Sequence, residues 1–442
     1  MNKKEQFINK NNSIHKKSWQ IAIRTFFVFL FVIAFLGLLL PLRPKESELE
    51  KRELSKFPKP TVSTLISGEF FTDISTWYAD TFPFRESFLS ANAKLKQFYG
   101  ITTQEIYGDA VEGDEIPDAD AEMVTTPTPT PEAEPEPVLE DATIHVQPEK
   151  LGKIYVAENR GFEVYGFSLA GADAYINMIN SAAAQLKDIA NVYDILVPTS
   201  IAVNLDEENQ KKVNSNNQKD AFAYVYGHLD ASIHQVPVLE TLQKHNSEYL
   251  YFKTDHHWTA DGAYYAYKAL MEAKGMTPSP LSAYTKKEFP DFIGSFYQYS
   301  DQSDTLKNNP DTVVAYIPSC NDLVYTNTDG EQVNGSVVAD ATSYSQANKY
   351  LCFICGDQPY ERIENPNITD NSSCVVIKES YGNAFVPFLV NSYQTVHVVD
   401  YRYFTGNLIN LVKQNQIQDV IYLNNSNALI ESAVKNMSRI IN

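Results

Sequence analysis

The sequence is poor in cysteine and histidine, with four cysteines and eight histidines among 442 residues. Cys352 and Cys355 have C-x-x-C spacing, but a zinc site built from such pairs needs a second pair, and Cys320 and Cys374 stand alone. This scarcity excludes the common cysteine-based zinc modules. We interpret all four residues as buried or half-buried thiols, with a disulfide as the alternative if the domain lies outside the cytoplasm.

Basic residues are missing between Asp109 and Asp141, where the chain places twelve acids. These acids account for most of the net charge of −19, and such a balance excludes nucleic acid as the partner. The same stretch carries Thr-Pro repeats and no aromatic residue. It cannot bury enough apolar surface to order itself, so we expect residues 109–149 to form a disordered, acidic, Pro/Thr-rich linker.

No small-x-small cleavage motif follows the apolar run Phe26–Leu40, which is preceded by lysines and by Arg24. The run is near the lower length limit for a spanning helix, and Arg24 can snorkel. We therefore expect a cytoplasmic tail over residues 1–20 and an uncleaved transmembrane helix over residues 21–42. Large domains are translocated largely regardless of flanking charge, so we place the protein in the cytoplasmic membrane as a single-pass protein with an extracytoplasmic C-terminal domain.

Apolar residues recur at helical spacing in two stretches after this run, Phe70–Tyr78 and Phe88–Tyr99, with Pro83 between them. We expect a pair of helices there. Residues 43–108 are accordingly predicted to form a juxtamembrane helical segment.

Strand-like and helix-like patterns alternate from residue 150 to residue 442. "GKIYVA" and "GFEVYG" read as short strands joined by a turn, and "VYDILVPTS" reads as a buried strand after an amphipathic helix. Further strands are predicted in "EYLYFKTD", "SCVVIKES", "TVHVVDYR" and "IQDVIYLNN". Such alternation predicts an α/β domain with a mainly parallel sheet covered on both faces. Sites in such sheets form at the carboxyl ends of the strands.

Two polar clusters, "TDHHW" and "KESYGN", fall at such strand ends. In an extended segment, residues i and i+2 share a face, so Asp255 and His257 are expected to point one way and His256 the other. An aspartate that holds a histidine fixes its tautomer and stabilises the imidazolium that forms. Ser380 is the candidate nucleophile, since the free amides of the helix that follows it can stabilise an oxyanion.

Two other interpretations of the histidine stretch stay open. Asp255 can be an N-terminal helix residue beside a surface histidine. A metal site is the second alternative, because histidine and aspartate supply N and O ligands. The candidate ligands are Asp255, His256 and His257, with His228, Asp230 and His234 upstream. Adjacent residues of an extended segment diverge, however, so we predict no bound metal, and we interpret Trp258 as a packing residue.

"TDHHWTADGAYYAY" resembles the signature of the DHHW protein family. Other stretches resemble blocks of that family in the same order, and together they span most of the chain apart from the acidic linker. These stretches are "KRELSKFP", "SGEFFTDISTWYADTFPFRE", "FIGSFY", "DTVVAYIP", "IKESYGNAFVPFLVNSY" and "VVDYRYF". More distantly, the pattern is similar to the SGNH-hydrolase-like domains of alginate O-acetyltransferase proteins, in which an Asp-x-His motif precedes a serine nucleophile.

The resemblance implies a three-layer α/β/α, SGNH-hydrolase-like (flavodoxin-like) domain over residues 150–442. Asp255 and His257 match the Asp-x-His pair, Ser380 matches the nucleophile, and His256 inherits no role. Lys378 and Glu379 depart from the related pattern, which more often offers a small residue and an aspartate. Among neighbouring residues, Asn383 is a candidate oxyanion donor, and Tyr381 and Arg402 are candidate groove residues, although a buried tyrosine and a structural arginine are the simpler readings.

The function expected from these features is serine-dependent O-acyl transfer or acetyl-ester hydrolysis on a cell-surface polysaccharide, without a cofactor. The relatives imply that a multispanning membrane acyltransferase delivers the acyl donor. The alternative is a cell-envelope scaffold that binds glycan without turnover.

Overall fold

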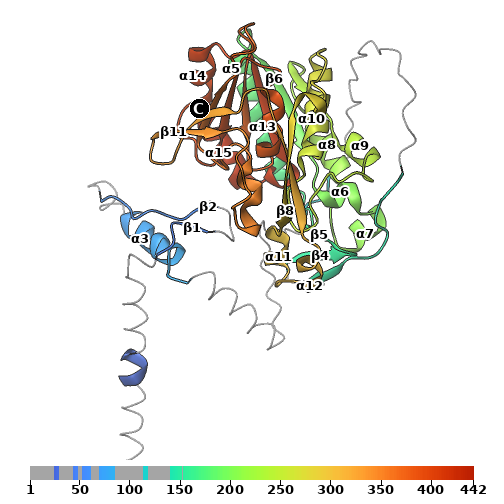
Figure 1. Cartoon of the computed structure of the whole chain (residues 1–442), viewed down its shortest axis with the longest axis vertical. Coiled ribbons are helices and arrows are strands. Elements are labelled where there is room, and N and C mark those ends of the chain that lie inside the picture. The colour runs from blue at the N-terminus through green and yellow to red at the C-terminus, as the bar shows by residue number, and fades with distance from the viewer. Residues whose placement is uncertain are drawn as a thin grey trace, which may run out of the picture. The chain divides into compact units, whose positions relative to one another are not determined.

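The computed structural model describes residues 24–28, 43–47, 52–60, 69–84, 113–117, 140–151 and 153–442 (Figure 1). The chain divides into two units, Met1–Ile101 and Thr102–Asn442, and we describe each by itself. The predicted tail lies outside the described residues, as does most of the predicted anchor, of which only 24–28 is described, as helix. Among the described helices, none combines the length and apolar character needed to cross a bilayer.

The first unit contains a short antiparallel pair and a helix. Strands β1 (Glu46–Ser47) and β2 (Arg52–Glu53) pair with each other, and α3 covers Glu69–Asp80. Trp77 of α3 is buried, and the guanidinium of Arg43 lies 3.9 Å from its ring centroid. The helix predicted over Phe70–Tyr78 is therefore confirmed. The helix predicted over Phe88–Tyr99 lies outside the described residues.

The second unit is built on an eight-stranded mixed sheet (Figure 1). In spatial order its strands are β11 (Gln332–Ser336), β10 (Asp322–Thr326), β12 (Tyr360–Glu364), β14 (Thr395–Asp400), β13 (Ser373–Lys378), β15 (Asp419–Asn425), β6 (Asn191–Val197) and β7 (Ile233–Gln235). The five strands from β14 to β7 are parallel to their neighbours within this group, whereas β11, β10 and β12 form an antiparallel extension. The mainly parallel sheet was predicted and the extension was not.

Every residue of the central strands β13 and β15 is buried, as expected for parallel strands covered on both faces. The longer helices around the sheet are α5 (Leu169–Leu186), α8 (Gln218–Gly227), α10 (Ala260–Ala273), α13 (Gly382–Leu389), α14 (Leu408–Asn415) and α15 (Glu431–Ile441). Consecutive residues of β6 show that helices lie on both faces. Asp194 accepts a hydrogen bond from Tyr175 of α5, while the ring of Tyr193 faces Lys274 at the end of α10.

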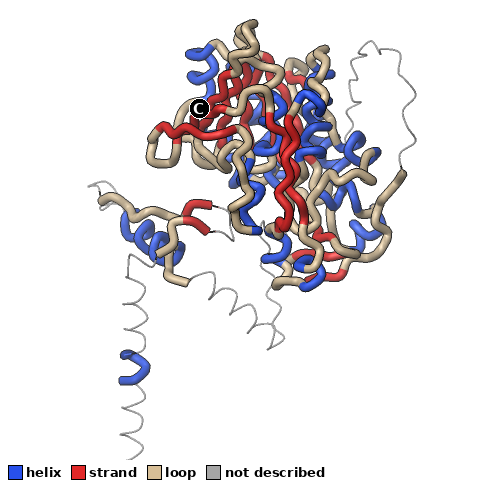
Figure 2. The backbone as a smooth tube through the Cα atoms, viewed as in Figure 1, coloured by secondary structure: helices blue, strands red, loops and turns tan. Residues whose placement is uncertain are grey.

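Shorter elements surround this core. They are β3 (Glu149–Leu151), β4 (Ile154–Ala157) and β5 (Arg160–Phe162), helices α6 (Ser200–Asn204), α7 (Glu207–Lys212), α9 (Leu239–Lys244), α11 (Ser295–Tyr299) and α12 (Asp304–Lys307), and 3-10 helices η2 (Leu281–Ala283), η3 (Gln346–Cys352) and η4 (Ser426–Ala428). β3, β4 and β5 form the predicted strand-turn-strand unit with one extra strand. A separate antiparallel pair, β8 (Thr285–Phe292) and β9 (Asp311–Ile317), crosses the front of the unit (Figure 2).

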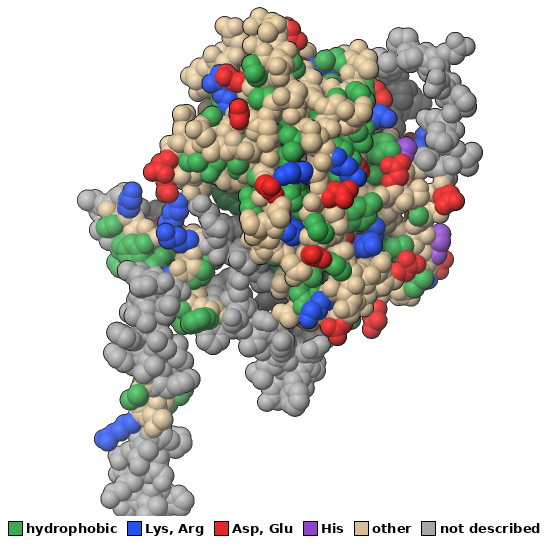
Figure 3. Space-filling model, viewed as in Figure 1, with side chains coloured by type: hydrophobic (Ala, Val, Ile, Leu, Met, Phe, Trp, Pro, Cys, Tyr) green, Lys and Arg blue, Asp and Glu red, His purple; other side chains and the backbone are tan. Residues whose placement is uncertain are grey.

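The described ends of the predicted acidic linker contact this unit. Asp114 donates its N–H to the carbonyl of Phe167 (2.8 Å), and Ile144 forms a bridge with Leu205. On the visible face of the α/β unit, acidic and basic side chains are interspersed (Figure 3). The excess of acidic residues therefore does not make this face uniformly negative.

The strand predicted in "EYLYFKTD" is wrong. The structure has only an isolated bridge between Tyr251 and Trp258, followed by bends up to the start of α10. The physical cause is Asp311 of β9, whose carboxylate accepts hydrogen bonds from the amides of Lys253 (3.0 Å) and Thr254 (2.7 Å). These amides are thus bonded to a side chain and cannot pair with a neighbouring strand.

Candidate active site

The histidine stretch forms a fixed loop just before α10. Besides the two amides, Asp311 accepts from the hydroxyl of Thr254 (2.6 Å) and from that of Tyr249. Thr259 caps α10, since its hydroxyl accepts from the N–H of Gly262 (3.3 Å). Trp258 is fully buried and donates to the carbonyl of Tyr381 (2.8 Å), so it packs the loop against the segment after β13.

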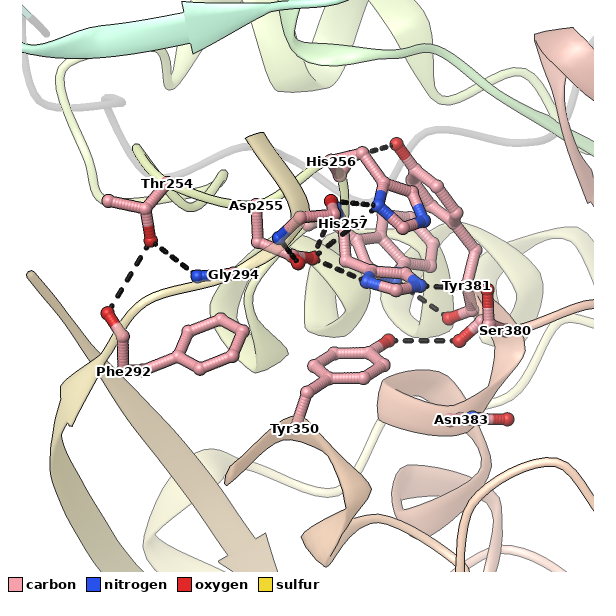
Figure 4. Close-up of polar contacts among 12 residues, drawn as sticks. Thr254, Asp255, His256, His257, Phe292, Gly294, Tyr350, Ser380, Tyr381 and Asn383 are labelled. Carbon is pink, nitrogen blue, oxygen red and sulfur yellow. Dashed lines mark hydrogen bonds and ion pairs between the residues drawn. The ribbon is translucent and has the colours of Figure 1, made fainter. Parts of the chain in front are cut away.

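Within this loop, Asp255 and His257 meet Ser380 (Figure 4). Nδ1 of His257 lies 2.6 Å from Oδ1 of Asp255, and Nε2 of the same ring lies 2.8 Å from Oγ of Ser380. Asp255 and His257 are buried and Ser380 is half-buried. The structure therefore brings together the three residues that the sequence singled out, in the order carboxylate, imidazole, hydroxyl.

The pairing of Asp255 with His257 comes from a bend and not from an extended strand. Oδ1 of Asp255 also accepts the N–H of His257 (3.1 Å), which closes a tight side-chain turn. The expectation that His256 points away is wrong for the same reason. Its ring centroid lies 3.8 Å from that of His257, at an interplanar angle of 37°.

The second oxygen of Asp255 is held from another part of the chain. Oδ2 accepts the N–H of Ser295, the first residue of α11, at 2.8 Å. This approach requires glycine at position 294, because a Cβ there would lie 2.2 Å from both Cβ and Oδ2 of Asp255. Glycine thus lets the α11 segment pass directly against the buried carboxylate.

The imidazole of His257 lies between two other rings. Tyr350 stacks on one face, with centroids 4.1 Å apart and planes within 12°, and His256 lies on the other. Tyr350 also donates its hydroxyl to the carbonyl of Ser380 (3.0 Å). One tyrosine therefore fixes both the base and the backbone of the candidate nucleophile.

Ser380 lies between β13 and α13, at the carboxyl end of the central strand. Glu379 fastens this turn, because its carboxylate accepts from the N–H of Tyr381 (3.0 Å), the N–H of Asn425 (3.2 Å) and the hydroxyl of Ser380 (3.3 Å). The next two amides donate to the carbonyls of Glu379 and Ser380. The amides expected to be free for an oxyanion are therefore engaged in the structure.

The side chains of the other predicted site residues lie beside the central group without bonding to the hydroxyl of Ser380. Asn383 donates to Asp357 (2.8 Å), and Arg402 pairs with Asp357 (2.9 Å) and Asp400 (2.6 Å). Tyr381 is buried and donates its hydroxyl to the carbonyl of His256. These contacts indicate that the three residues support the structure of the site rather than bind the substrate.

Lys378, two residues before Ser380, forms a charged cluster with Arg402, Asp357 and Asp400. Its ammonium is fully buried, 3.1 Å from Asp400 and 3.3 Å from Asp357. Burial alone would lower the pKa of Lys378, but these two carboxylates raise it. Burial opposes ionisation of Asp357, yet Arg402 and Lys378 hold its pKa well below its usual range. The cluster thus keeps its charges paired, which is the condition for burying them.

Among the described residues, one group could supply metal ligands. Asp255, His256 and His257 offer ligand atoms that all lie within 4.8 Å of one another. The expected divergence of adjacent ligands is absent, because the loop is bent. The upstream His228 and Asp230 are engaged elsewhere, with Tyr224 and Ser232.

Four residues that support the site were not predicted: Gly294, Ser295, Asp311 and Tyr350. All four lie between the histidine stretch and Ser380 in the chain and act through contacts that no local spacing displays. The block "FIGSFY", which contains Gly294 and Ser295, was noted only as a family resemblance. A glycine beside a serine at a helix start was the one signal available there.

Replacing Gly294 by alanine should displace Asp255 and weaken its hold on His257. For the acyl transfer that an acid, a base and a hydroxyl in this order could perform, a misplacement of about 1 Å costs about 100-fold in rate, so we expect kcat for an acyl ester such as p-nitrophenyl acetate to fall by about that factor. Gly330→Ala is the control, since Gly330 has φ +82° with nothing within 4 Å of its added Cβ, in the turn between β10 and β11. If both variants lose activity equally, the close approach at Asp255 is not the cause.

Comparisons with known proteins agree with this architecture. The family model described as "DHHW protein" matches residues 50–127 and 123–399. A DHHW family protein of known structure, from Eubacterium siraeum, is 28% identical with a TM-score of 0.61, over 67% of this chain and 99% of that chain. A search among curated proteins gave no match.

PatB1 from Bacillus cereus shares the fold at lower identity. Its structure with a sulfonyl adduct is 18% identical with a TM-score of 0.54, over 64% of this chain and 97% of that chain. A second PatB1 structure is 20% identical with the same TM-score, over 64% of this chain and 98% of that chain. The family model covers well over half of the sequence, and the chain therefore belongs to the DHHW protein family.

Proposed function

We propose that the protein is an extracytoplasmic, membrane-anchored serine O-acyltransferase or acetylesterase that acts on a cell-surface polysaccharide. The observation that carries this proposal is the continuous series from Asp255 through His257 to Ser380, with contacts of 2.6 and 2.8 Å. An acid, a base and a hydroxyl in this order are what nucleophilic acyl transfer requires. The burial of Asp255 and His257 strengthens their interaction by excluding water.

In the first half of the proposed reaction, Oγ of Ser380 attacks the carbonyl carbon of an acyl ester. His257 takes the hydroxyl proton on Nε2, and Asp255 stabilises the resulting imidazolium through Nδ1. The tetrahedral adduct then loses the alcohol of the donor, which leaves with the proton from His257. The products are an acyl-Ser380 ester and a free alcohol.

In the second half, a sugar hydroxyl or water approaches the acyl-enzyme. His257 removes its proton as the oxygen attacks the acyl carbon, and the Ser380–acyl bond breaks. Ser380 recovers its proton from His257. Transfer to a sugar gives an acylated polysaccharide, and transfer to water gives the free acid, so the same residues serve a transferase and an esterase.

The location and partners are part of the proposal. The apolar run before residue 42 supports an anchor, and an enzyme outside the cytoplasm meets cell-surface polysaccharide. A multispanning membrane acyltransferase would supply the acyl donor, as the resemblance to the alginate O-acetyltransferase proteins implies. The related PatB1 carries a sulfonyl adduct in one structure, and sulfonyl fluorides react with activated serines, so this reagent class is the natural probe here.

The test is turnover of p-nitrophenyl acetate by the full-length chain, with and without an excess of EDTA. We expect acetate release that EDTA leaves intact, because the proposed chemistry uses no metal. Loss of activity with EDTA and its return with a divalent ion would support a metal site at Asp255, His256 and His257 instead. Binding of polysaccharide with no turnover of any acyl ester would support the scaffold alternative.

A further inference from the structure

His256 is the one member of the Asp-His-His stretch without a part in the proposed reaction. It is also the only one of the three that is accessible. Its side chain is 31% exposed, whereas that of Asp255 is 0% and that of His257 is 2% exposed. A molecule approaching this stretch from solvent therefore meets His256 first.

The ring of His256 is held in place from several sides. Nδ1 lies 2.7 Å from Oγ of Ser295, and the N–H of Ser295 in turn holds Asp255. The backbone carbonyl of His256 accepts the hydroxyl of Tyr381. Together with the close, tilted contact between the rings of His256 and His257, these contacts fix the orientation of a partly exposed ring. Such fixed orientation is expected of a residue that contacts a ligand.

The two faces of His257 differ in access. Tyr350 covers one face and is itself buried, with its hydroxyl bonded to the carbonyl of Ser380. The half-exposed His256 borders the other face, and Ser380 lies beyond the edges of both imidazoles (Figure 4). His256 is thus the accessible ring beside the base that would accept the proton of an incoming hydroxyl.

We propose that His256 contacts the carbohydrate substrate, by hydrogen-bonding a sugar hydroxyl next to the one that reacts. This inference rests on the proposed acyl transfer at Ser380. Nδ1 contacts Ser295, so the sugar hydroxyl would bond to Nε2, and a hydroxyl can either donate to an imidazole nitrogen or accept from its N–H. His256 thus directs the acyl group toward a sugar rather than water.

The test is the variant His256→Phe, which keeps a ring against His257 and removes both nitrogens. The acetyl-enzyme formed from p-nitrophenyl acetate is offered methyl β-glucopyranoside, and acetylated sugar and free acetate are both quantified. Reaction of Ser380 with phenylmethylsulfonyl fluoride is measured in parallel, because it needs no sugar. His228→Phe is the matched control, since it makes the same substitution at a histidine at the end of α8 whose Nδ1 contacts the carbonyl of Tyr224 (2.7 Å).

We expect the ratio of acetyl sugar to acetate to fall about tenfold in His256→Phe, the effect of losing one hydrogen bond in this class of interaction. Sulfonylation of Ser380 should slow much less, by about threefold at most. The sulfonyl fluoride has no sugar hydroxyl, so this reaction does not depend on the hydrogen bond that His256 would make. His228→Phe should keep the transfer ratio of the wild type.

Three outcomes would overturn the inference. One is an equal loss of transfer and sulfonylation in His256→Phe, which means that His256 only positions His257. Another is an unchanged transfer ratio, and a third is a wild-type acetyl-enzyme that releases acetate to water alone. Failure of the proposed function gives a different result. In that case Ser380 of the wild type would neither react with the sulfonyl fluoride nor become acetylated.

Discussion

Ser380→Ala should reduce turnover of p-nitrophenyl acetate by about a thousandfold or more, because it removes the proposed nucleophile and leaves His257 with nothing to activate. Reaction with phenylmethylsulfonyl fluoride should be lost as well. The fold should be retained, since the Ser380 hydroxyl faces His257 and Glu379 and the backbone of the turn is held by Tyr350 and Glu379. Far-UV circular dichroism and thermal unfolding check this point.

The matched control for Ser380→Ala lies at the other end of the same strand. Ser373 begins β13, and its hydroxyl contacts the backbone around Gln416 and Gln418. Ser373→Ala should retain turnover and labelling, even if it unfolds at a lower temperature. Survival of both activities in Ser380→Ala would contradict the proposed nucleophile, whatever the control shows.

Asp255→Asn should lower kcat by about 10⁴-fold, with a much smaller change in KM. The wild-type carboxylate accepts from Nδ1 and the N–H of His257 on one oxygen and from the N–H of Ser295 on the other. An amide has one oxygen only, so its NH2 group must face a donor in either orientation. If the NH2 group faces His257, the ring loses the acceptor that selects its tautomer, and in both orientations it loses the negative charge that stabilises the imidazolium.

Asp261→Asn is the control for this substitution. Asp261 lies in the first turn of α10 and accepts from the hydroxyl of Tyr316 (2.7 Å), away from the contacts of Asp255. We expect it to keep kcat within about threefold, because the amide oxygen can still accept from Tyr316 and the change lies outside the reacting groups. Activity of Asp255→Asn within tenfold of the wild type would mean that the carboxylate does not orient a catalytic base.

Much of the parallel core could be predicted from sequence because its signals are local. The buried run before Ser380 and the helical pattern after it define β13 and α13 without knowledge of the rest. The antiparallel extension could not be inferred, because the residue pattern of β10 and β11 does not reveal which sheet these strands join. Their pairing depends on long-range contacts to β12 and, through it, to β14.

The candidate site likewise combines features that local patterns indicate with features that depend on long-range contacts. Asp255, His257 and Ser380 were identified from residue type and position, but the geometry behind the choice was different. An extended strand was expected here, whereas Asp311 accepts hydrogen bonds from the amides of a bent loop in which His256 lies against His257. No local pattern indicates that an aspartate more than fifty residues downstream caps this loop. Gly294 and Tyr350 were missed for the same reason, since their roles exist only in the folded chain.

The central claim is that acyl groups pass through Ser380, and mass spectrometry of the acylated protein tests it most directly. The full-length chain is mixed briefly with p-nitrophenyl acetate, quenched in acid and digested, and the acetylated peptide is sequenced. We expect one acetyl group on Ser380, formed at the rate of the initial burst and absent from Ser380→Ala. Acetate release without an acetylated Ser380, or with the acetyl group on another residue at the burst rate, would contradict it.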